Sequence, residues 1–319
     1  MIRCEGLTRR FRDVTAVDGL DLSVEKGELF GLVGPDGAGK TTTMRMLAGI
    51  LRPTSGTAKV AGHDIVRDPE GVKGRIAYMA QRFGLYVDLT VAENIAFYGD
   101  LYGVSRKGRG ERTDRLLTMA GMEPFKRRRA GNLSGGMKQK LALVCSLIHS
   151  PEVLLLDEPT NGVDPVSRRD FWRILYQLLR EGVTVFVSTA YLDEAERCSR
   201  LVLLHKGRRV GHGSPDEVKG LVRGSILEVR LDAPRQAAES LRAALPPGSV
   251  NVFGDRLHVT ADDAAEGERA IRRALGARPG NVEITAVAPS LEDVFVSVLA
   301  REGLSTGAPA PGEADGRPK

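Results

Sequence analysis

Runs of apolar residues alternate with glycine-rich or charged segments along the first two thirds of the chain. Continuous apolar runs predict strands buried on both faces, as in a parallel sheet, at 29–33, 153–156 and 183–187. Helical spacing of apolar residues predicts helices at 43–48, 91–98, 141–148 and 168–180. Shorter strands are predicted at 2–7, 21–24, 57–60 and 75–80. The pattern predicts an α/β domain over residues 1–222, with a helical subdomain at about 82–150.

The last third of the chain has a different order of elements. Its alternating and amphipathic segments predict strand, helix, strand, strand, helix and strand at 226–231, 235–244, 250–253, 256–259, 263–275 and 282–287. This order predicts a small α+β, ferredoxin-like domain over 225–302. A final helix is expected after Ser290, which would cap it together with Asp293. Gly, Pro, Ala and charged residues dominate 303–319, which predicts a disordered tail.

Composition changes this picture only slightly. No apolar run approaches the roughly 20 residues of a membrane-spanning helix and no signal peptide is visible, so a cytoplasmic protein is expected. The three cysteines lack metal or disulfide spacing and are expected to be reduced. The net charge of +5 is mild, and basic runs at 106–109 and 126–129 predict solvated loops, with attraction to lipid headgroups as the alternative. These runs are not interleaved with aromatic residues, so no nucleic-acid partner is expected.

A glycine-rich segment follows the first buried strand and opens directly onto a helix. Its residues are Gly34, Pro35, Asp36, Gly37, Ala38, Gly39, Lys40, Thr41 and Thr42. Glycines in this context let backbone N–H groups turn inward around an anion, and the helix N-terminus adds unpaired N–H donors. Lys40 would reach the β- and γ-phosphates of a nucleotide, and the Thr41 hydroxyl would bind Mg²⁺. The segment therefore predicts a nucleotide-binding loop.

Acidic residues at the end of the second buried strand complete the predicted site. Asp157 would hold Mg²⁺ through water, and Glu158 is placed to polarise a water against the γ-phosphate. Gln81 leaves the strand at 75–80 and can contact Mg²⁺ and the attacking water, with a plain surface glutamine as the alternative. We therefore predict Glu158 and Gln81 as catalytic residues, and Thr41, Gln81 and Asp157 as metal ligands.

Two further features are candidates for nucleotide contacts. Ser134, Gly135 and Gly136 lead into the helix at 141–148. Ser134 is a good N-cap and the glycines leave the helix start bare, so this segment predicts a second anion site. Phe11 lies in an otherwise polar segment, where it could stack on an adenine ring or anchor a hairpin.

Taken in order, these motifs resemble those of the ATP-binding subunits of ABC transporters, over about residues 1–220. Walker A, Q-loop, signature, Walker B and D-loop correspond to 34–42, Gln81, 133–137, 153–157 and Asp164. The signature and D-loop segments look most like those of ABC-2 type exporters of the drug-resistance and polysaccharide-export kind. The resemblance implies a P-loop NTPase (RecA-like) core with an antiparallel β-subdomain and a helical subdomain. It also implies ATP and Mg²⁺ as cofactors.

The resemblance further implies how such a subunit works. Two subunits sandwich two ATP molecules, and the signature of each binds the γ-phosphate held by the other. Closure and opening of this pair of subunits would be transmitted to an integral-membrane ABC-2 permease through the groove beside Gln81. The subunits would lie on the inner face of the cell membrane. The C-terminal domain would stabilise the dimer or regulate it, or it is a passive accessory.

One position departs from the family pattern in a way that bears on catalysis. The family carries a histidine after Ser188-Thr189, and here the residue is Ala190. An alanine methyl cannot donate a hydrogen bond to the γ-phosphate, so slow hydrolysis is expected at this Walker A site. Asp36 and Met137 are smaller departures, where asparagine and glutamine are usual.

The same kind of departure marks the first nucleotide-binding half of tandem ABC-2 exporter ATPases, which this sequence resembles most. We therefore expect a heterodimer with a second ATPase subunit, and a homodimer is the rival. Two other functions stay open: a non-transport ABC ATPase acting on the ribosome or nucleic acid, and a catalytically silent regulatory subunit.

Overall fold

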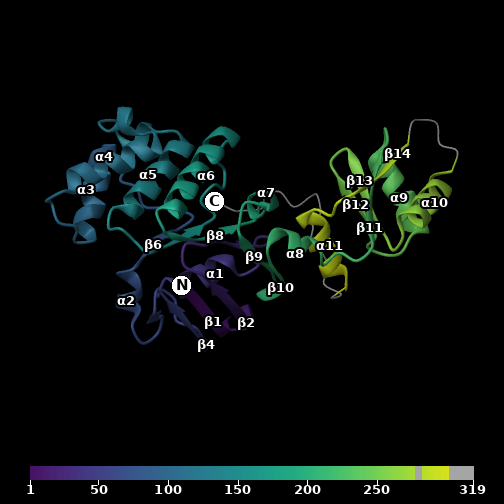
Figure 1. Ribbon diagram of the computed structural model, residues 1–319, viewed down its shortest axis with the longest axis horizontal. Helices are drawn as coiled ribbons and strands as arrows, with labels where there is room; N and C mark the ends of the chain where they lie inside the picture. The colour runs from purple at the N-terminus through teal and green to yellow at the C-terminus, as the bar shows by residue number, and fades with distance from the viewer. Residues whose placement is uncertain (277–281, 302–319) are drawn as a thin grey trace, which may run out of the picture. The chain divides into compact units, whose positions relative to one another are not determined.

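The structure is a computed structural model that describes residues 1–276 and 282–301. The chain divides into two compact units, of which the first spans Met1–Pro215 and the second begins at Asp216 (Figure 1). The tail predicted at 303–319 lies outside the described residues. No helix within the described ranges is long and apolar enough to cross a bilayer.

A six-stranded sheet forms the centre of the first unit, in the order β10-β9-β3-β8-β7-β6. The bounds of its strands are β3 Leu29–Val33, β6 Ile76–Met79, β7 Val153–Asp157, β8 Thr184–Thr189, β9 Arg200–His205 and β10 Arg208–Gly213. All neighbours pair in parallel except β9 and β10, which are antiparallel. The predicted α/β architecture with a parallel sheet is confirmed.

Both faces of this sheet are buried, which explains the continuous apolar runs. Successive side chains of a strand point to opposite faces. Leu154 and Leu156 of β7 therefore join one apolar cluster, which includes Trp172, whereas Val153 and Leu155 join another. The helices beside the sheet in the first unit include α1 Lys40–Leu47, α6 Pro165–Arg180 and α7 Leu192–Ala195.

Helix α6 begins earlier than the sequence analysis placed it. The sequence predicts a helix at 168–180, but α6 starts at Pro165. The Asp164 carboxylate accepts hydrogen bonds from the backbone N–H groups of Val166 (3.1 Å) and Ser167 (2.9 Å). Asp followed by Pro is a common way to begin a helix, because proline at the first position loses no hydrogen bond.

A four-stranded antiparallel sheet adds the β-subdomain, in the order β2-β1-β4-β5. Its strands are β1 Ile2–Phe11, β2 Val14–Val24, β4 Ser55–Val60 and β5 His63–Asp64, followed by α2 Pro69–Lys73. Strands β1 and β2 are longer than the predicted segments 2–7 and 21–24. The pairing of β1 with β2 shifts register between Leu7 and Arg9 and between Arg9 and Arg10, so regular apolar alternation does not mark their outer halves.

The helical subdomain contains α3 Val91–Leu101, α4 Arg109–Ala120 and α5 Gly135–Leu147, with short 3-10 turns at Glu123–Phe125 and Ala130–Asn132. Thr90 and Glu93 form a capping box at the start of α3. The sequence analysis assigned Arg109 to a solvated loop. In the structure Arg109 begins α4, and its guanidinium binds the Asp100 carboxylate (2.6 Å) and the Val104 carbonyl.

The second unit has the predicted ferredoxin-like topology. Its elements are α8 Pro215–Lys219, which starts at the boundary, β11 Ser225–Arg230, α9 Pro234–Ala244, β12 Val250–Phe253, β13 Arg256–Ala261, α10 Ala264–Leu275, β14 Glu283–Val287 and α11 Leu291–Arg301. The antiparallel sheet has the order β12-β13-β11-β14. Ser290 and Asp293 bond reciprocally at the start of α11, which confirms the predicted cap.

A cluster of charged side chains ties α11 to this sheet. Imidazole Nδ1 of His258 on β13 lies 2.8 Å from the Asp293 carboxylate, and Nε2 lies 3.5 Å from Glu228 of β11. Glu228 is also paired with Arg230 and Arg256, each at 2.8 Å. The hydrogen bond to Asp293 raises the pKa of His258 above 6.5, although burial opposes it. Burial also opposes ionisation of Asp293, but hydrogen bonds from His258 and Ser290 outweigh it and lower the pKa of this carboxyl.

These shifts predict a pH dependence for the stability of the second unit. A raised pKa means that His258 contributes its stabilisation fully below pH 6.5 and loses it as the pH rises through the folded-state pKa. We expect the free energy of opening of β13, measured by amide hydrogen exchange, to fall by about 1–2 kcal/mol from pH 6 to pH 9. His258→Gln should remove that dependence, while His212→Gln, at an exposed position of the first unit, should not. A wild-type profile that matches His258→Gln would contradict the expectation.

Candidate functional site

The glycine-rich loop lies at the carboxyl end of β3, and α1 begins at Lys40. Gly37 and Gly39 have φ angles of 76° and 105°, a backbone region that residues with a Cβ rarely adopt. A Cβ on Gly34 would lie 2.3 Å from the Leu204 carbonyl oxygen, so this position also requires glycine for space. A loop with this backbone conformation can turn successive N–H groups toward an anion.

Lys40 is buried within this loop, with 4% of its side chain exposed. Its ammonium donates hydrogen bonds to the carbonyls of Gly34 (2.8 Å) and Pro35 (2.9 Å) and lies 2.9 Å from the Glu158 carboxylate. A buried ammonium needs such partners, because leaving water costs several kcal/mol. These three contacts fix the position of the Lys40 ammonium within the loop.

Asp157 ends β7 within hydrogen-bonding distance of three hydroxyl groups. Its Oδ1 accepts from Thr41 (3.1 Å) and from Ser188 of β8 (2.8 Å), and its Oδ2 accepts from Tyr78 of β6 (3.3 Å). Burial, and then the charge of Asp157, raises the pKa of Tyr78 to about 12, so this phenol stays a donor. Thr41 and Asp157 present a hydroxyl and a carboxylate side by side, which are hard oxygen donors of the kind that suit Mg²⁺.

Glu158 adopts a left-handed backbone conformation, with φ of 49°. Its backbone N–H donates to the Ser188 carbonyl (3.2 Å) and hydroxyl (3.1 Å), which hold this conformation. Its carboxylate accepts hydrogen bonds from Gln81 (3.1 Å) and Asn161 (3.3 Å). Non-glycine residues with positive φ are costly and concentrate at functional sites. The structure thus brings Gln81, Lys40 and Glu158 together.

A small cavity of about 130 Å³ lies beside this cluster. It is lined by Asp36, Glu158, Thr160, Asn161, Thr189, Ala190 and Tyr191. None of the chain's five histidines lines it. The Tyr191 hydroxyl donates to Asn161 (3.3 Å) and the Arg168 guanidinium lies 4.3 Å from the Tyr191 ring, so both side chains are engaged within the subunit.

Three groups around the phosphate loop were not found from the sequence: Tyr78, Ser188 and Asn161. Each lies near the carboxyl end of a strand, and that position is the only signal that the sequence carries. No motif distinguishes these polar residues from other polar residues at strand ends.

The predicted signature and adenine contacts lie apart from this cluster. Ser134 caps α5, since its hydroxyl accepts a hydrogen bond from the Met137 N–H (3.3 Å). Within the described part of the chain, no hydrogen bond or ion pair joins Ser134, Gly135 or Gly136 to the phosphate loop. Phe11 is 40% exposed at the tip of the β1–β2 hairpin, with the Arg9 guanidinium 4.4 Å from its ring centroid.

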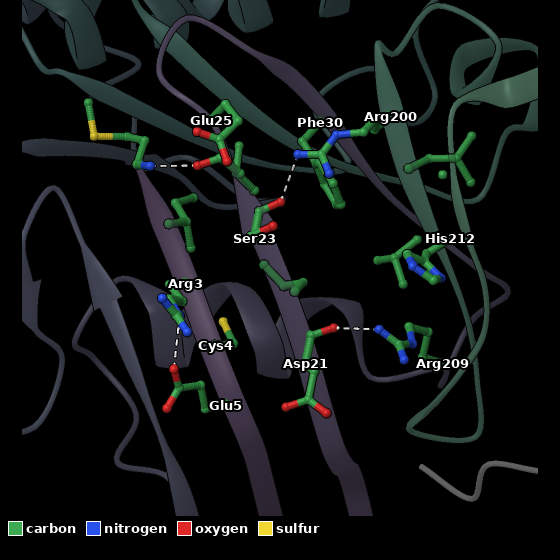
Figure 2. A pocket seen from close by; sticks show the side chains of 17 residues that line it. Arg3, Cys4, Glu5, Asp21, Ser23, Glu25, Phe30, Arg200, Arg209 and His212 are labelled. Atoms are coloured by element: carbon green, nitrogen blue, oxygen red, sulfur yellow. Dashed lines mark hydrogen bonds and ion pairs between the residues drawn. The ribbon is translucent and has the colours of Figure 1, made fainter. Parts of the chain in front are cut away.

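A larger cavity of about 650 Å³ lies between β1 and β2 on one side and β9 and β10 on the other (Figure 2). Its arginines are already engaged. Arg200 binds Glu28 through two nitrogens (2.6 and 2.9 Å), and Arg209 donates to the Asp21 carbonyl (3.0 Å). Burial raises the pKa of the Cys4 thiol on its wall, so that thiol is not reactive. None of the predicted nucleotide-binding residues lines this cavity.

Comparisons with known proteins decide the family. The sequence profile of the ABC transporter family matches residues 17–161. The daunorubicin/doxorubicin resistance ATP-binding protein DrrA of Streptomyces peucetius is 35% identical over 93% of this chain and 92% of its own length. The chain belongs to the ABC transporter family.

Other ABC relatives differ in length or show the fold alone. The probable multidrug ABC transporter ATP-binding protein YbhF of Escherichia coli is 42% identical over 96% of this chain. The chain spans about half of that relative, 53% of its length. The solved ATP-binding subunit of an ABC transporter has a TM-score of 0.63 at 28% identity, covering 69% of this chain and 92% of its own. A dimeric ATP-binding cassette bound to ADP and Pi has a TM-score of 0.61 at 24% identity, covering 67% and 98%.

Proposed function

We propose that this chain is the ATP-binding subunit of an ABC-2 type exporter. It would hydrolyse ATP at an interface between two such subunits and drive a separate membrane permease. The observation that carries the proposal is the meeting of Lys40, Asp157 and Glu158 at the carboxyl ends of β3 and β7. Relatives named for multidrug export, daunorubicin resistance and Nod factor export support the exporter role.

The residues of the site have separate tasks in this proposal. The loop at 34–42 binds the phosphates through its N–H groups and Lys40. Thr41, Asp157 and Gln81 hold Mg²⁺, which supplies charge neutralisation on the phosphates. Glu158 orients and polarises the attacking water. Because Lys40 lies 2.9 Å from Glu158 in this structure, the arriving γ-phosphate takes over the ammonium and leaves the carboxylate free for the water.

Ala190 makes the two sites of the dimer unequal in this proposal. The cavity beside Ala190 has no histidine to meet a γ-phosphate. The signature turn at Ser134 is well formed and would complete the site of a partner that keeps the histidine. This arrangement resembles the first nucleotide-binding half of a tandem ABC-2 ATPase, and the alignment to 53% of YbhF is consistent with it. We therefore favour a heterodimer over a homodimer.

The permease would bind an exposed apolar surface on the helical subdomain, which we call the α3 patch. It consists of Tyr86, Val87, Phe97, Leu101 and Tyr102, which are between 37% and 63% exposed. The Tyr86 and Phe97 rings pack edge to face with centroids 4.5 Å apart. Exposed clusters of this kind mark protein interaction sites. Tyr86, the first residue of the patch, follows Gln81 by five residues. The patch is therefore close in the chain to a residue of the proposed ATP site.

Substitution within the patch tests the proposal. We expect Phe97→Asp to abolish co-purification of the chain with membrane proteins and its peripheral association with the inner face of the cell membrane. ATP binding should stay unchanged. Ile50→Asp is the matched control, because Ile50 is 59% exposed and lies outside the patch. Wild-type co-purification with ribosomes or RNA, and not with a permease, would favour the non-transport alternative.

A further inference from the structure

A fully buried carboxylate lies near the ATP site. Glu194 of α7 has 0% of its side chain exposed. Burial of an unpaired carboxylate is strongly unfavourable, so its oxygens must find donors inside the protein. The donors come from segments that are far apart in the chain, and two of these segments belong to the proposed site.

The first two donors are hydroxyl groups beside the site, one from the loop after β7 and one from the end of β8. Glu194 Oε1 accepts from Thr160 (2.5 Å), which follows Glu158 by two residues. Glu194 Oε2 accepts from Thr189 (2.7 Å), which immediately precedes Ala190. One carboxylate thus joins the loop of the catalytic candidate to the loop of the missing histidine.

The other donors come from α6. The Trp172 indole N–H donates to Glu194 Oε1 (3.2 Å), and Arg168 Nε lies 3.6 Å from the same oxygen. Helix α6 in turn packs on α5, the helix that the signature turn begins. Lys140 of α5 and Asp170 of α6 form an ion pair at 3.6 Å. A Cβ on Gly136 would lie 2.3 Å from the Ser167 side chain, so the first turns of α5 and α6 are in close contact.

We propose that Glu194 is a positioning residue, which makes the loops at Thr160 and Thr189 move together with α6. ATP bound at the Walker A loop displaces Glu158 and the loop at Ala190. Glu194 passes this displacement to α6 and then to the signature turn. A signature turn that serves the facing site thereby senses the nucleotide on its own subunit. The inference rests on the proposed role of Glu158 and adds the path between the two sites.

Trp172 allows a direct test, because it is the only tryptophan in the chain and bonds to Glu194. We expect Mg-ATP to change the Trp172 emission of the wild-type protein. Thr160→Val removes one donor and keeps the shape of the side chain. In this variant the emission change should be lost and kcat should fall about fivefold, the effect of one hydrogen bond. The KM for ATP should stay within about twofold, since no phosphate contact is removed.

Two further variants separate positioning from general stability. Glu194→Gln keeps the size of the side chain and one acceptor oxygen, so it should retain part of the emission change. Ser146→Ala removes another fully buried hydroxyl, one that bonds to Ala142 of its own helix (2.8 Å), and should leave both emission and kcat as in wild type.

The outcomes distinguish this inference from the proposed function. If ATP binds, as measured with a fluorescent ATP analogue, but wild-type Trp172 emission does not respond, the positioning role is wrong and the proposed function stands. The same conclusion follows if Thr160→Val lowers only the melting temperature. If the wild-type chain binds no ATP, the proposed function fails and the inference fails with it.

Discussion

Glu158→Gln is expected to lower the ATP turnover of the purified chain by at least about 100-fold, the usual range for loss of a general base. The amide cannot take a proton from the attacking water. ATP binding should persist, because the phosphate loop and Thr41 are unchanged. Release of Lys40 from its 2.9 Å ion pair with the carboxylate also leaves the ammonium available to phosphate. Steady-state turnover and equilibrium binding of a fluorescent ATP analogue measure the two effects.

Glu152→Gln is the matched control for this substitution. Glu152 lies just before β7, is paired with Arg75 at 2.5 Å and is 40% exposed, so its loss should change turnover by less than about twofold. Equal turnover of the wild type and Glu158→Gln, in the chain alone and in the assembled transporter, would identify a catalytically silent regulatory subunit.

Ala190→His is expected to raise turnover at least about tenfold, since one preorganised donor at a developing anion contributes about 100-fold or more. Ala190 lines the cavity of about 130 Å³ that also contains Glu158 and Asp36. An imidazole placed there adds a donor beside the proposed position of the γ-phosphate. The measurement is Mg²⁺-dependent turnover of the purified chain, with Glu158→Gln as the blank.

Ala190→Leu fills the same cavity without adding a donor, and it should leave turnover at the wild-type level or lower. The double variant Ala190→His/Glu158→Gln should have the same low turnover as Glu158→Gln alone. The imidazole assists the carboxylate and does not replace it. High wild-type turnover that Ala190→His does not increase would argue against the unequal dimer. A homodimer that uses Glu158 without a switch histidine would then be the working description.

Local patterns in the sequence determined much of this protein. Strand, glycine-rich loop and helix follow one another within about twenty residues, so the phosphate loop could be predicted with its bounds. The caps at Ser134 and Ser290 depend on contacts three residues away and are visible in the same way. The ferredoxin-like order of the second unit also follows from consecutive elements.

The tertiary structure decided which distant residues meet. Tyr78 and Ser188 reach Asp157 only because β6 and β8 lie on either side of β7. The order of strands in a parallel sheet cannot be predicted from any single segment of the sequence. Glu194 has no local signal at all, since its donors come from a loop, from β8 and from α6. Sequence patterns report contacts within a few residues, whereas the partners of a buried carboxylate depend on packing of the whole domain.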